Sequence, residues 1–384
     1  MPPTKKRDVP YVVPISPHDV DIREALGVPV INPSPAFHST GAKYQEVCSR
    51  KGLFHTFFGL RSKYRKSAFD EGSYLHHAMK ALLDGNPSRS AQRVVNELCD
   101  KVLDELHATA GDEGRHVEDS EVFDIRKASA LGYSCAHMVW LKLVPLIDSG
   151  KLRLVGAEVP LDVELDVSGV YCRVRCTLDA VWETGEGELI TDWKSVGTHM
   201  GEATEGYRDS LQSYLYTIAR RAHNESVGRD WPVRDFTYVN VMKPGIRRKG
   251  LHTSSPQSLA DYVAECEEWW AGRGRHIGRA STAAKTPPVQ LVTLPVPDLI
   301  PWDMISRMDQ YATWLKDFSS EQQLFSLYDF PRVEGACKVG AMKCPYWRLC
   351  KEPPTSWAQV VADHYTQEPD PLDSDSRRTT NGHK

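Results

Sequence analysis

Two residues in the middle of the sequence, Asp192 and Lys194, have the types and the spacing of a hydrolytic site. They lie in a segment, Glu188 to Val196, that follows a Gly-rich turn and is predicted to be a strand. Successive side chains on a strand point to opposite faces, so Asp192 and Lys194 project together while Trp193 projects the other way. A carboxylate and an ammonium group would therefore share one face.

A second carboxylate is predicted to lie opposite Asp192. The turn Thr184 to Gly187 predicts a hairpin, and a hairpin symmetric about Gly185 and Glu186 places Asp179 directly across from Asp192. Directly opposed residues have Cβ atoms about 4.5–5.5 Å apart, where like charges destabilise the sheet. A divalent cation such as Mg²⁺ or Mn²⁺, which prefers oxygen ligands, would compensate.

The chemistry that uses these groups is phosphodiester hydrolysis. A metal ion lowers the pKa of water and neutralises the phosphate, while the ammonium of Lys194 orients the nucleophile or stabilises developing charge. The D-x-K spacing alone does not distinguish this site from a solvated ion pair on an exposed strand.

Periodicity predicts the elements that would position these residues. Apolar residues recur at helical spacing over residues 44–60, 73–83, 91–108 and 129–148, and again from Leu211 to Ala219. Strict alternation predicts strands over 158–167 and 170–180, and Phe236 to Met242 is predicted to be a further strand. A helical block followed by a sheet indicates an α/β fold.

Composition narrows the class of protein. With 384 residues, 41% of them hydrophobic, the chain can bury a sizeable core. No apolar run is long enough to span a bilayer and no leader follows Met1, so we expect a soluble cytoplasmic protein. Nine cysteines without a secretory signal indicate metal binding or burial rather than disulfides.

Local basic segments, rather than overall charge, would have to bind nucleic acid, because 47 basic and 51 acidic residues give a net charge of −4. Between Lys43 and Lys66, basic and aromatic residues alternate in a pattern that could follow phosphates and stack on bases. Smaller basic clusters surround Lys243 and follow Trp270. A solvated basic face is the alternative for each.

Five sequence elements occur in the order typical of one nuclease family. They are Gly72-x-x-x-His76, the acidic residue Glu158, Asp179 in Thr-Leu-Asp-Ala-Val, Asp192-x-Lys194, and Gln212-x-x-x-Tyr216. In this order the sequence resembles the RecB-like branch of the PD-(D/E)XK superfamily, which includes CRISPR-associated and phage exonucleases. The resemblance spans about Tyr44 to Pro354. It implies a restriction-endonuclease-like α/β core with a mixed central sheet flanked by helices, an N-terminal helical block and a C-terminal Cys-rich loop.

The resemblance also implies roles for individual residues. Asp179 and Asp192 would be the central metal ligands, and Lys194 the catalytic lysine. His76 would be a further ligand, with His77 as its alternative. The set is completed by the carbonyl of Trp193 and by Glu158, which binds the metal or only a neighbouring side chain.

The helix after the D-x-K strand is expected to contribute two residues to the site, and one position near the site departs from the family pattern. Gln212 and Tyr216, one helical turn apart, would support the site or contact the strand being cut, and a core role for Tyr216 is the alternative. The family usually has a glycine three residues before the first aspartate. This chain has Cys176 there, which would narrow the approach of DNA.

Three cysteines, Cys337, Cys344 and Cys350, are concentrated near the C-terminus. Together with Cys48 they resemble the [4Fe-4S] ligands of this branch, although the first late spacing is six residues instead of the commoner two. Four thiolates hold either Zn²⁺ or an iron-sulfur cluster, and spacing does not separate the two. The resemblance favours iron-sulfur, with structural Zn²⁺ and three unrelated thiols as alternatives.

The expected organisation follows from these patterns. Residues 1–40 form an irregular lead. Residues 41–355 form the nuclease domain, with a helical insert at about 70–150, the catalytic sheet at about 155–245 and a Cys-rich closure at 335–352. Residues 356–384 form a polar, flexible tail.

The resemblance implies a DNA exonuclease that acts on single-stranded DNA or frayed duplex ends in recombination or DNA processing. It would be phage-encoded, cytoplasmic in a bacterial host, and accompanied by a recombination partner protein. A catalytically silent DNA-binding module and a structure-specific endonuclease are the alternatives. The oligomeric state stays open.

Overall fold

The computed structural model describes residues 20–32, 35–37, 39–63, 67–85, 88–112, 114–167, 170–197, 207, 210–244, 246, 258–272, 289–295, 301–318, 325, 329–330, 333, 338–339 and 342–368. The chain divides into two compact units. The sheet unit comprises Arg65–Met308, and the terminal unit comprises Met1–Tyr64 together with Asp309–Lys384.

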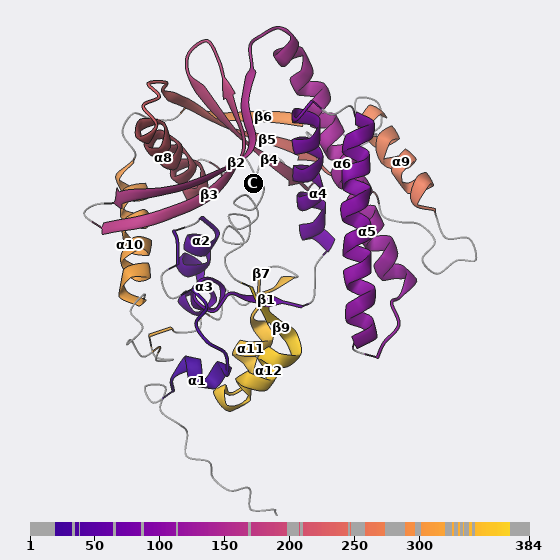
Figure 1. Cartoon of the computed structure of the whole chain (residues 1–384). Helices are drawn as coiled ribbons and strands as arrows, with labels where there is room; N and C mark the ends of the chain where they lie inside the picture. Colours follow the sequence, from indigo (N-terminus) through magenta and orange to yellow (C-terminus); the bar gives the residue numbers. More distant parts are fainter. Residues whose placement is uncertain are drawn as a thin grey trace, which may run out of the picture. The chain divides into compact units, whose positions relative to one another are not determined.

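The sheet unit contains a five-stranded mixed sheet with helices before and between its strands (Figure 1). Its elements are α4 (Ser67–Leu83), α5 (Ser88–Asp112), α6 (Asp119–Asp148), β2 (Arg153–Val167), β3 (Val170–Glu183), β4 (Glu188–Val196), α8 (Leu211–Ser226), β5 (Val233–Met242), α9 (Leu259–Gly272) and β6 (Val289–Pro295). The spatial order is β2-β3-β4-β5-β6. Only the β4–β5 pair is parallel, and α8 supplies the crossover that such a pair requires. The expected mixed sheet flanked by helices is confirmed.

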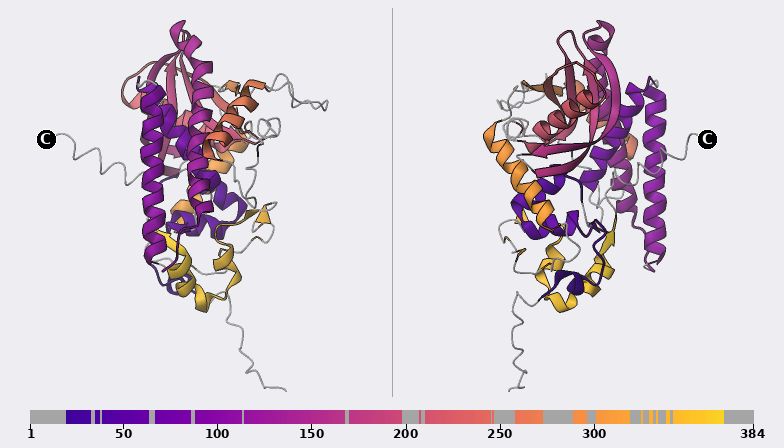
Figure 2. Two further views of the ribbon diagram at one scale, coloured as in Figure 1. Left: turned by 90° about the vertical axis from the view of Figure 1, so that its right-hand side faces the viewer. Right: turned by 60° about the vertical axis from the view of Figure 1, so that its left-hand side comes forward.

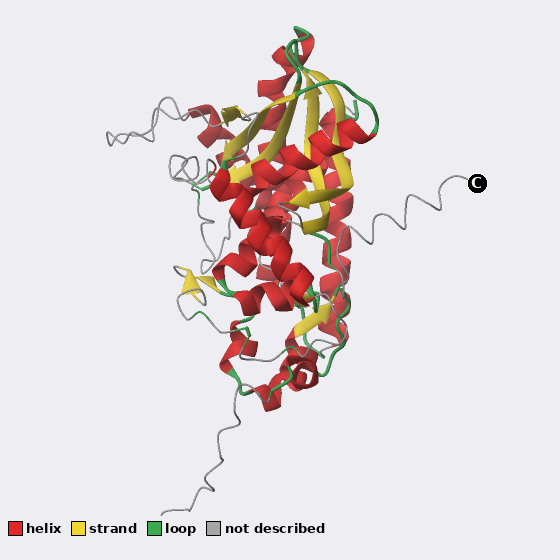
Figure 3. Ribbon diagram, turned by 90° about the vertical axis from the view of Figure 1, so that its left-hand side faces the viewer, coloured by secondary structure: helices red, strands yellow, loops and turns green. Residues whose placement is uncertain are grey.

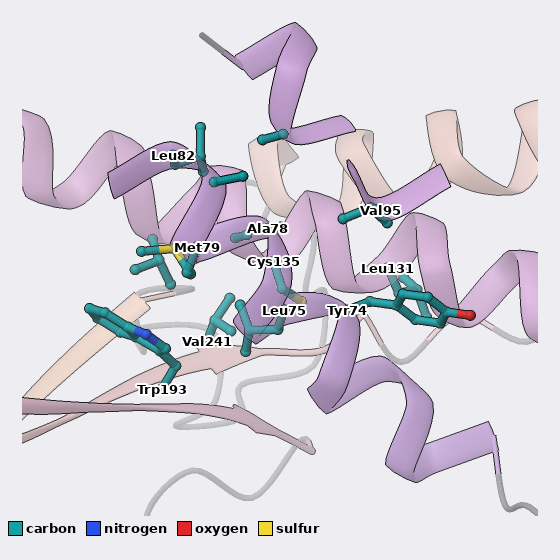
Figure 4. Packing of buried hydrophobic residues seen from close by; sticks show 14 of the residues in the cluster. Tyr74, Leu75, Ala78, Met79, Leu82, Val95, Leu131, Cys135, Trp193 and Val241 are labelled. Carbon is teal, nitrogen blue, oxygen red and sulfur yellow. The ribbon is translucent and has the colours of Figure 1, made fainter. Parts of the chain in front are cut away.

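One face of the sheet is apolar and is covered by the helical block. Trp193 of β4 and Val239 and Val241 of β5 are completely or almost completely buried in one core with residues of α4 and α6. Figure 4 shows Leu75, Ala78 and Met79 of α4 beside these strands. Alternate residues of β4 and β5 thus pack against the helices, and the residues between them are left for the opposite face.

The opposite face is covered by α8, and a buried ion pair fixes it there. Glu188 at the start of β4 is completely buried and accepts two hydrogen bonds from Arg220 of α8, at 2.8 and 2.9 Å. Asn224, one turn further along α8, donates a third at 3.0 Å. Figure 3 shows the strands as a twisted layer with helices on either side.

The two longest helices, α5 and α6, run side by side and extend the helical block (Figure 2). Among the described residues, α6 is the one helix long and apolar enough to cross a membrane. Ala128, Leu131, Cys135 and Val139 of α6 are buried in the core of the sheet unit. This side of α6 is therefore occupied by packing against its neighbours.

The terminal unit joins both ends of the described chain around an aromatic core. Its elements are α1 (Ile22–Leu26), α2 (Ser39–Val47), α3 (Ser49–Thr56), β1 (Leu60–Ser62), β7 (Lys338–Val339), β8 (Met342–Lys343), α11 (Trp347–Lys351), a 3₁₀ turn (Pro354–Ser356), α12 (Trp357–His364) and β9 (Tyr365–Gln367), and α10 (Trp302–Phe318) enters it from Asp309. Strands β1 and β9 pair antiparallel. The ring of Phe54 contacts Tyr346 and Trp357, and the Tyr346 hydroxyl donates to the Leu60 carbonyl.

Several expected boundaries were wrong. The helix predicted over 44–60 is interrupted at Cys48, which is extended and caps α3, and it gives way to a strand at Leu60. Residues 357–367, expected in a flexible tail, form α12 and β9, because Trp357 and Tyr365 are buried anchors within an otherwise polar segment. The lead expected over 1–40 contains α1, while residues 1–19 and 369–384 lie outside the described residues.

Replacing Gly132 of α6 with alanine should destabilise the sheet unit. A Cβ at this position would overlap the Cβ of Tyr74 and lie 2.9 Å from the carbonyl oxygen of Glu71, both on α4. Overpacking of this kind costs about 1–3 kcal/mol, which thermal or urea unfolding would measure. Gly111→Ala in α5 is the matched control, because a Cβ there meets nothing within 4 Å and should be neutral or stabilising. Equal stability of the two variants would contradict the close approach of α4 to α6.

Candidate active site

The site begins where β3 and β4 separate. The two strands pair only from Ala180–Thr191 to Glu183–Glu188, in the register that the turn predicted. Beyond this ladder β3 continues beside β2, and β4 continues beside β5. Asp179 and Asp192 are the first residues past the last pair, so two carboxylates lie where the strands part.

Asp179 is buried, and it is bonded to the backbone of β4. Its Oδ2 accepts a hydrogen bond of 2.7 Å from the N–H of Trp193, which would otherwise face β3 without a ladder partner. Its Oδ1 lies 3.2 Å from Nδ1 of His76. The Trp193 N–H and His76 are therefore partners of the Asp179 carboxylate, which a cation was expected to neutralise.

Asp192 is 2% exposed and has partners of its own. Lys194 Nζ lies 2.6 Å from its Oδ2, and Gln212 of α8 donates to its Oδ1 at 2.9 Å. Burial raises the pKa of Asp192, an effect that Lys194 opposes. Burial would lower the pKa of Lys194, but Asp192 and Asp179 outweigh it and keep the amine charged.

A three-residue group with the chemistry of a metal site lies at the fork. The ligand atoms of His76, Glu158 and Asp179 lie within 4.8 Å of one another. Burial acts to lower the pKa of His76, but Asp179 and Glu158 raise it to about 10. Nδ1 of His76 lies 3.4 Å from Glu158 Oε1 and 3.2 Å from Asp179 Oδ1, between the two carboxylates and in the place where a cation would hold them.

Glu158 reaches this group through an unusual backbone conformation. It is the one non-glycine residue with positive φ, at +50°, among the residues that the structure describes. The adjacent pairs Ala157–Ala180 and Val159–Leu178 place it across from Asp179, after a shift of register between Leu154 and Gly156. Such a conformation costs about 1–3 kcal/mol and is commonest at functional sites.

The donor set fits a divalent cation. Two carboxylates and an imidazole suit Mn²⁺ and accept Mg²⁺, and partly exposed groups leave room for water in the remaining positions. Within the described residues Asp192, expected as a central ligand, is not part of the group within 4.8 Å, because Lys194 and Gln212 hold it.

The remaining expected residues lie around this centre. The indole of Trp193 is buried in the apolar core (Figure 4), and its carbonyl as a ligand stays a prediction. Tyr216 packs its ring against Phe236, and burial raises its pKa. His77 is exposed, one residue past the group that contains His76. Cys176 is buried, and burial raises the pKa of its thiol to about 12.

The sequence analysis did not identify Tyr207, Tyr238 and Asn240, which lie on the face of the sheet that α8 covers. Tyr207 stacks on Tyr238, with ring centroids 3.9 Å apart, and its hydroxyl donates to Asn240 at 2.8 Å. Burial raises the pKa of Tyr207, and the charges of Lys194 and Asp192 also act on it. The sequence predicted the strand from Phe236 to Met242. The polar residue Asn240 within this strand was the one signal that could have pointed to the contact with Tyr207.

Three of the four expected cluster cysteines lie in described parts of the terminal unit. Cys48 is buried and lies between α2 and α3 in the chain. Cys344 lies shortly before α11, and Cys350 lies within α11. Burial raises the pKa of Tyr44, one turn before Cys48, and Cys344 raises it further. Burial also raises the pKa of Tyr365, with smaller contributions from Cys350 and Cys344. Cys337 lies outside the described residues.

The basic residues between Lys43 and Lys63 are largely engaged within the terminal unit. Arg50 is buried and donates to the Phe330 carbonyl, Arg61 donates to the carbonyls of His55 and Leu60, and Lys63 donates to Ala362. These bonds favour a structural role over phosphate binding. Tyr64 to Lys66, and the clusters at 247–249 and after Gly272, lie outside the described residues.

Comparison with known proteins gives one family. A family model described as the PD-(D/E)XK nuclease superfamily matches residues 43–351. No curated protein matches. Among 13 matching chains of solved structures is the one described as "Crystal structure of SSO0001", with 16% identity and a TM-score of 0.20. The match covers 39% of this chain and 65% of that chain, so less than two thirds of the solved protein is matched.

Mn²⁺ should raise the melting temperature of the wild-type protein, because a ligand that binds only the folded state stabilises it. At a concentration 100 times the dissociation constant the gain is about 2.7 kcal/mol. Asp179→Asn should abolish most of this shift while keeping an oxygen to accept from Trp193. Glu164→Gln, an exposed change on β2, is the control. Glu164→Gln should keep the shift, and a shift of wild-type size in Asp179→Asn would place the cation elsewhere.

Proposed function

Because the chain belongs to the PD-(D/E)XK nuclease superfamily, we propose that it hydrolyses phosphodiester bonds in DNA with a divalent metal ion. The observation that carries the proposal is the fork between β3 and β4. There two buried carboxylates, a lysine and a histidine lie together, with Glu158 held beside them in a strained conformation. A purely structural ion-pair network would gain nothing from that strain.

The proposed roles of the residues follow from their contacts. His76, Glu158 and Asp179 would hold the cation, with Asp192 and the Trp193 carbonyl at its margin. A cation there would lower the pKa of water and neutralise the phosphate. Lys194 keeps its charge and would stabilise the charge that develops on the phosphate. Gln212 fixes the Asp192 carboxylate, so that Lys194 and Asp192 stay in one orientation.

The finer activity that we propose is exonucleolytic cleavage of single-stranded DNA or frayed duplex ends, in recombination or DNA processing and with a recombination partner. It is supported by the order of the five motifs. Cys176, buried near Tyr216, stands in place of the usual glycine, and we propose that its added bulk favours single strands over a duplex.

Asp192→Ala and Lys194→Ala should each lower cleavage of DNA by about 10²–10³-fold, since each removes a group that acts on the charge of the transition state. Digestion of end-labelled DNA with Mg²⁺ or Mn²⁺ would measure the rates. Asp124→Ala and Lys142→Ala, exposed changes on α6, are the matched controls. Wild-type rates in both site variants would contradict the proposed function.

The form of the substrate separates the finer alternatives in the same assay. An exonuclease should degrade linear single strands and leave circular single-stranded DNA intact. Cleavage of the circle would indicate an endonuclease. A wild-type protein that binds DNA with Mn²⁺ but cuts none of these substrates would be the silent binding module.

We also propose that Cys48, Cys337, Cys344 and Cys350 hold one [4Fe-4S] cluster, with Zn²⁺ as the alternative. The proposal is supported by the packing of the segments that carry Cys48, Cys344 and Cys350 within the terminal unit. Four thiolates hold either a [4Fe-4S] cluster or Zn²⁺, so the metal content of the protein separates the proposal from its alternative.

Protein purified without oxygen should be brown, with broad absorption near 400 nm and about four irons per chain. Cys48→Ser should bleach it and lower the melting temperature, because a link between distant segments restricts the unfolded chain. Cys172→Ser, a half-buried thiol of β3, is the control that should keep the colour. One zinc per chain in colourless protein would establish the alternative.

A further inference from the structure

Asn240 is an unusual residue for its place in the fold. It lies on β5, the strand between β4 and β6, where Val239 and Val241 are 0% exposed, and it is itself 0% exposed. Asparagine is among the residues least favoured in strands, and an aliphatic side chain would continue the run of its neighbours. Stability therefore does not account for an amide at this position.

The amide of Asn240 is only half satisfied. Its Oδ1 accepts a hydrogen bond of 2.8 Å from the Tyr207 hydroxyl. Its Nδ2 has no hydrogen-bond partner among the described residues. A buried donor without a partner costs free energy, and such groups in folded proteins usually have a functional or solvent-related explanation.

The place of this amide links it to the proposed site. In the parallel ladder Asn240 is the neighbour of Lys194, and Tyr238 is the neighbour of Asp192. The ring of Tyr207 lies flat on Tyr238, with an interplanar angle of 14°. Tyr207 is half-buried, so it has accessible surface that Asn240 lacks. The phenol is thus fixed at two points beside the lysine and the carboxylate.

We propose that Tyr207 binds the phosphate of the nucleotide being cut, and that Asn240 is the positioning residue that orients its hydroxyl. This inference rests on the proposed function and adds a residue to its substrate contacts. A hydroxyl and an amide can bond in either direction. When the amide of Asn240 turns over, its N–H donates to the phenol oxygen. The hydroxyl proton of Tyr207 is then free to donate to a phosphate oxygen beside Lys194.

Tyr207→Phe and Asn240→Val test the pair. The first keeps the ring that stacks on Tyr238, and the second places a β-branched residue in a buried strand. Each should lower the single-turnover cleavage rate about tenfold, the effect of one hydrogen bond to a charged group. The double variant should lose no more than either single one, because the two residues act through one another. DNA affinity measured with Ca²⁺ should change little.

The melting temperature separates positioning from a structural role. Asn240→Val should leave the melting temperature unchanged or higher, whereas a structural amide would make the variant less stable by several degrees. Two control variants should keep the wild-type rate. Thr237→Val, elsewhere on β5, removes a hydrogen bond to Thr293, and Tyr171→Phe changes an exposed position.

Each outcome decides the inference. Wild-type rates in Tyr207→Phe and Asn240→Val, additive losses in the double variant, or a loss that follows a lower melting temperature would overturn it while the proposed function stands. An inactive wild-type protein would overturn both, and the Asp192→Ala comparison identifies that case, because it would then show no difference.

Discussion

The structure of the site depends on the burial of two carboxylates at one fork in the sheet. Asp179 and Asp192 are 6% and 2% exposed, and charges buried without partners would be far too costly for the fold to retain. Each is matched separately. Asp179 has His76 and the Trp193 N–H, and Asp192 has Lys194 and Gln212. Burial acts to lower the pKa of His76, but Asp179 and Glu158 raise it, and a cation needs the deprotonated imidazole as a ligand, so metal binding would be coupled to proton release.

Two helices bring the partners to this fork, and each is fixed by interactions away from it. Helix α4 supplies His76 and is fixed by Leu75, Ala78 and Met79 in the apolar core. Helix α8 supplies Gln212 and is fixed two turns later by the buried Glu188–Arg220 pair. A buried ion pair adds little to net stability, but it tolerates only one arrangement of its partners. Such a pair at the start of β4 therefore sets where Gln212 meets Asp192.

Much of this arrangement was predictable because it is local. The turn at Gly185 fixed the register of β3 on β4, and the period of two placed Asp192 and Lys194 on one face, as the structure has them. The strained Glu158 was predictable as a residue but not as a conformation, since the shift of register between Leu154 and Gly156 lies before the alternation that predicted the strand. Tyr207 and Asn240 were missed because their contact joins a connection to a strand 33 residues later, and no spacing rule reports such a pair. The order of 357–367 was missed because two buried aromatics outweigh a polar composition.

The alternation of side chains along β4 and β5 also explains why the site residues must lie at every second position of these strands. Trp193, Val239 and Val241 face the helical block, while Asp192, Lys194 and Asn240 face α8. A shift of one residue in either strand would exchange the two sets, so that an ammonium group and two polar side chains would enter the apolar core while an indole faced the carboxylates. The hydrophobic core and the chemistry therefore enforce the same register. The apolar residues between the site residues are as necessary to the site as the charged ones, because they make every other alignment of the strands unfavourable.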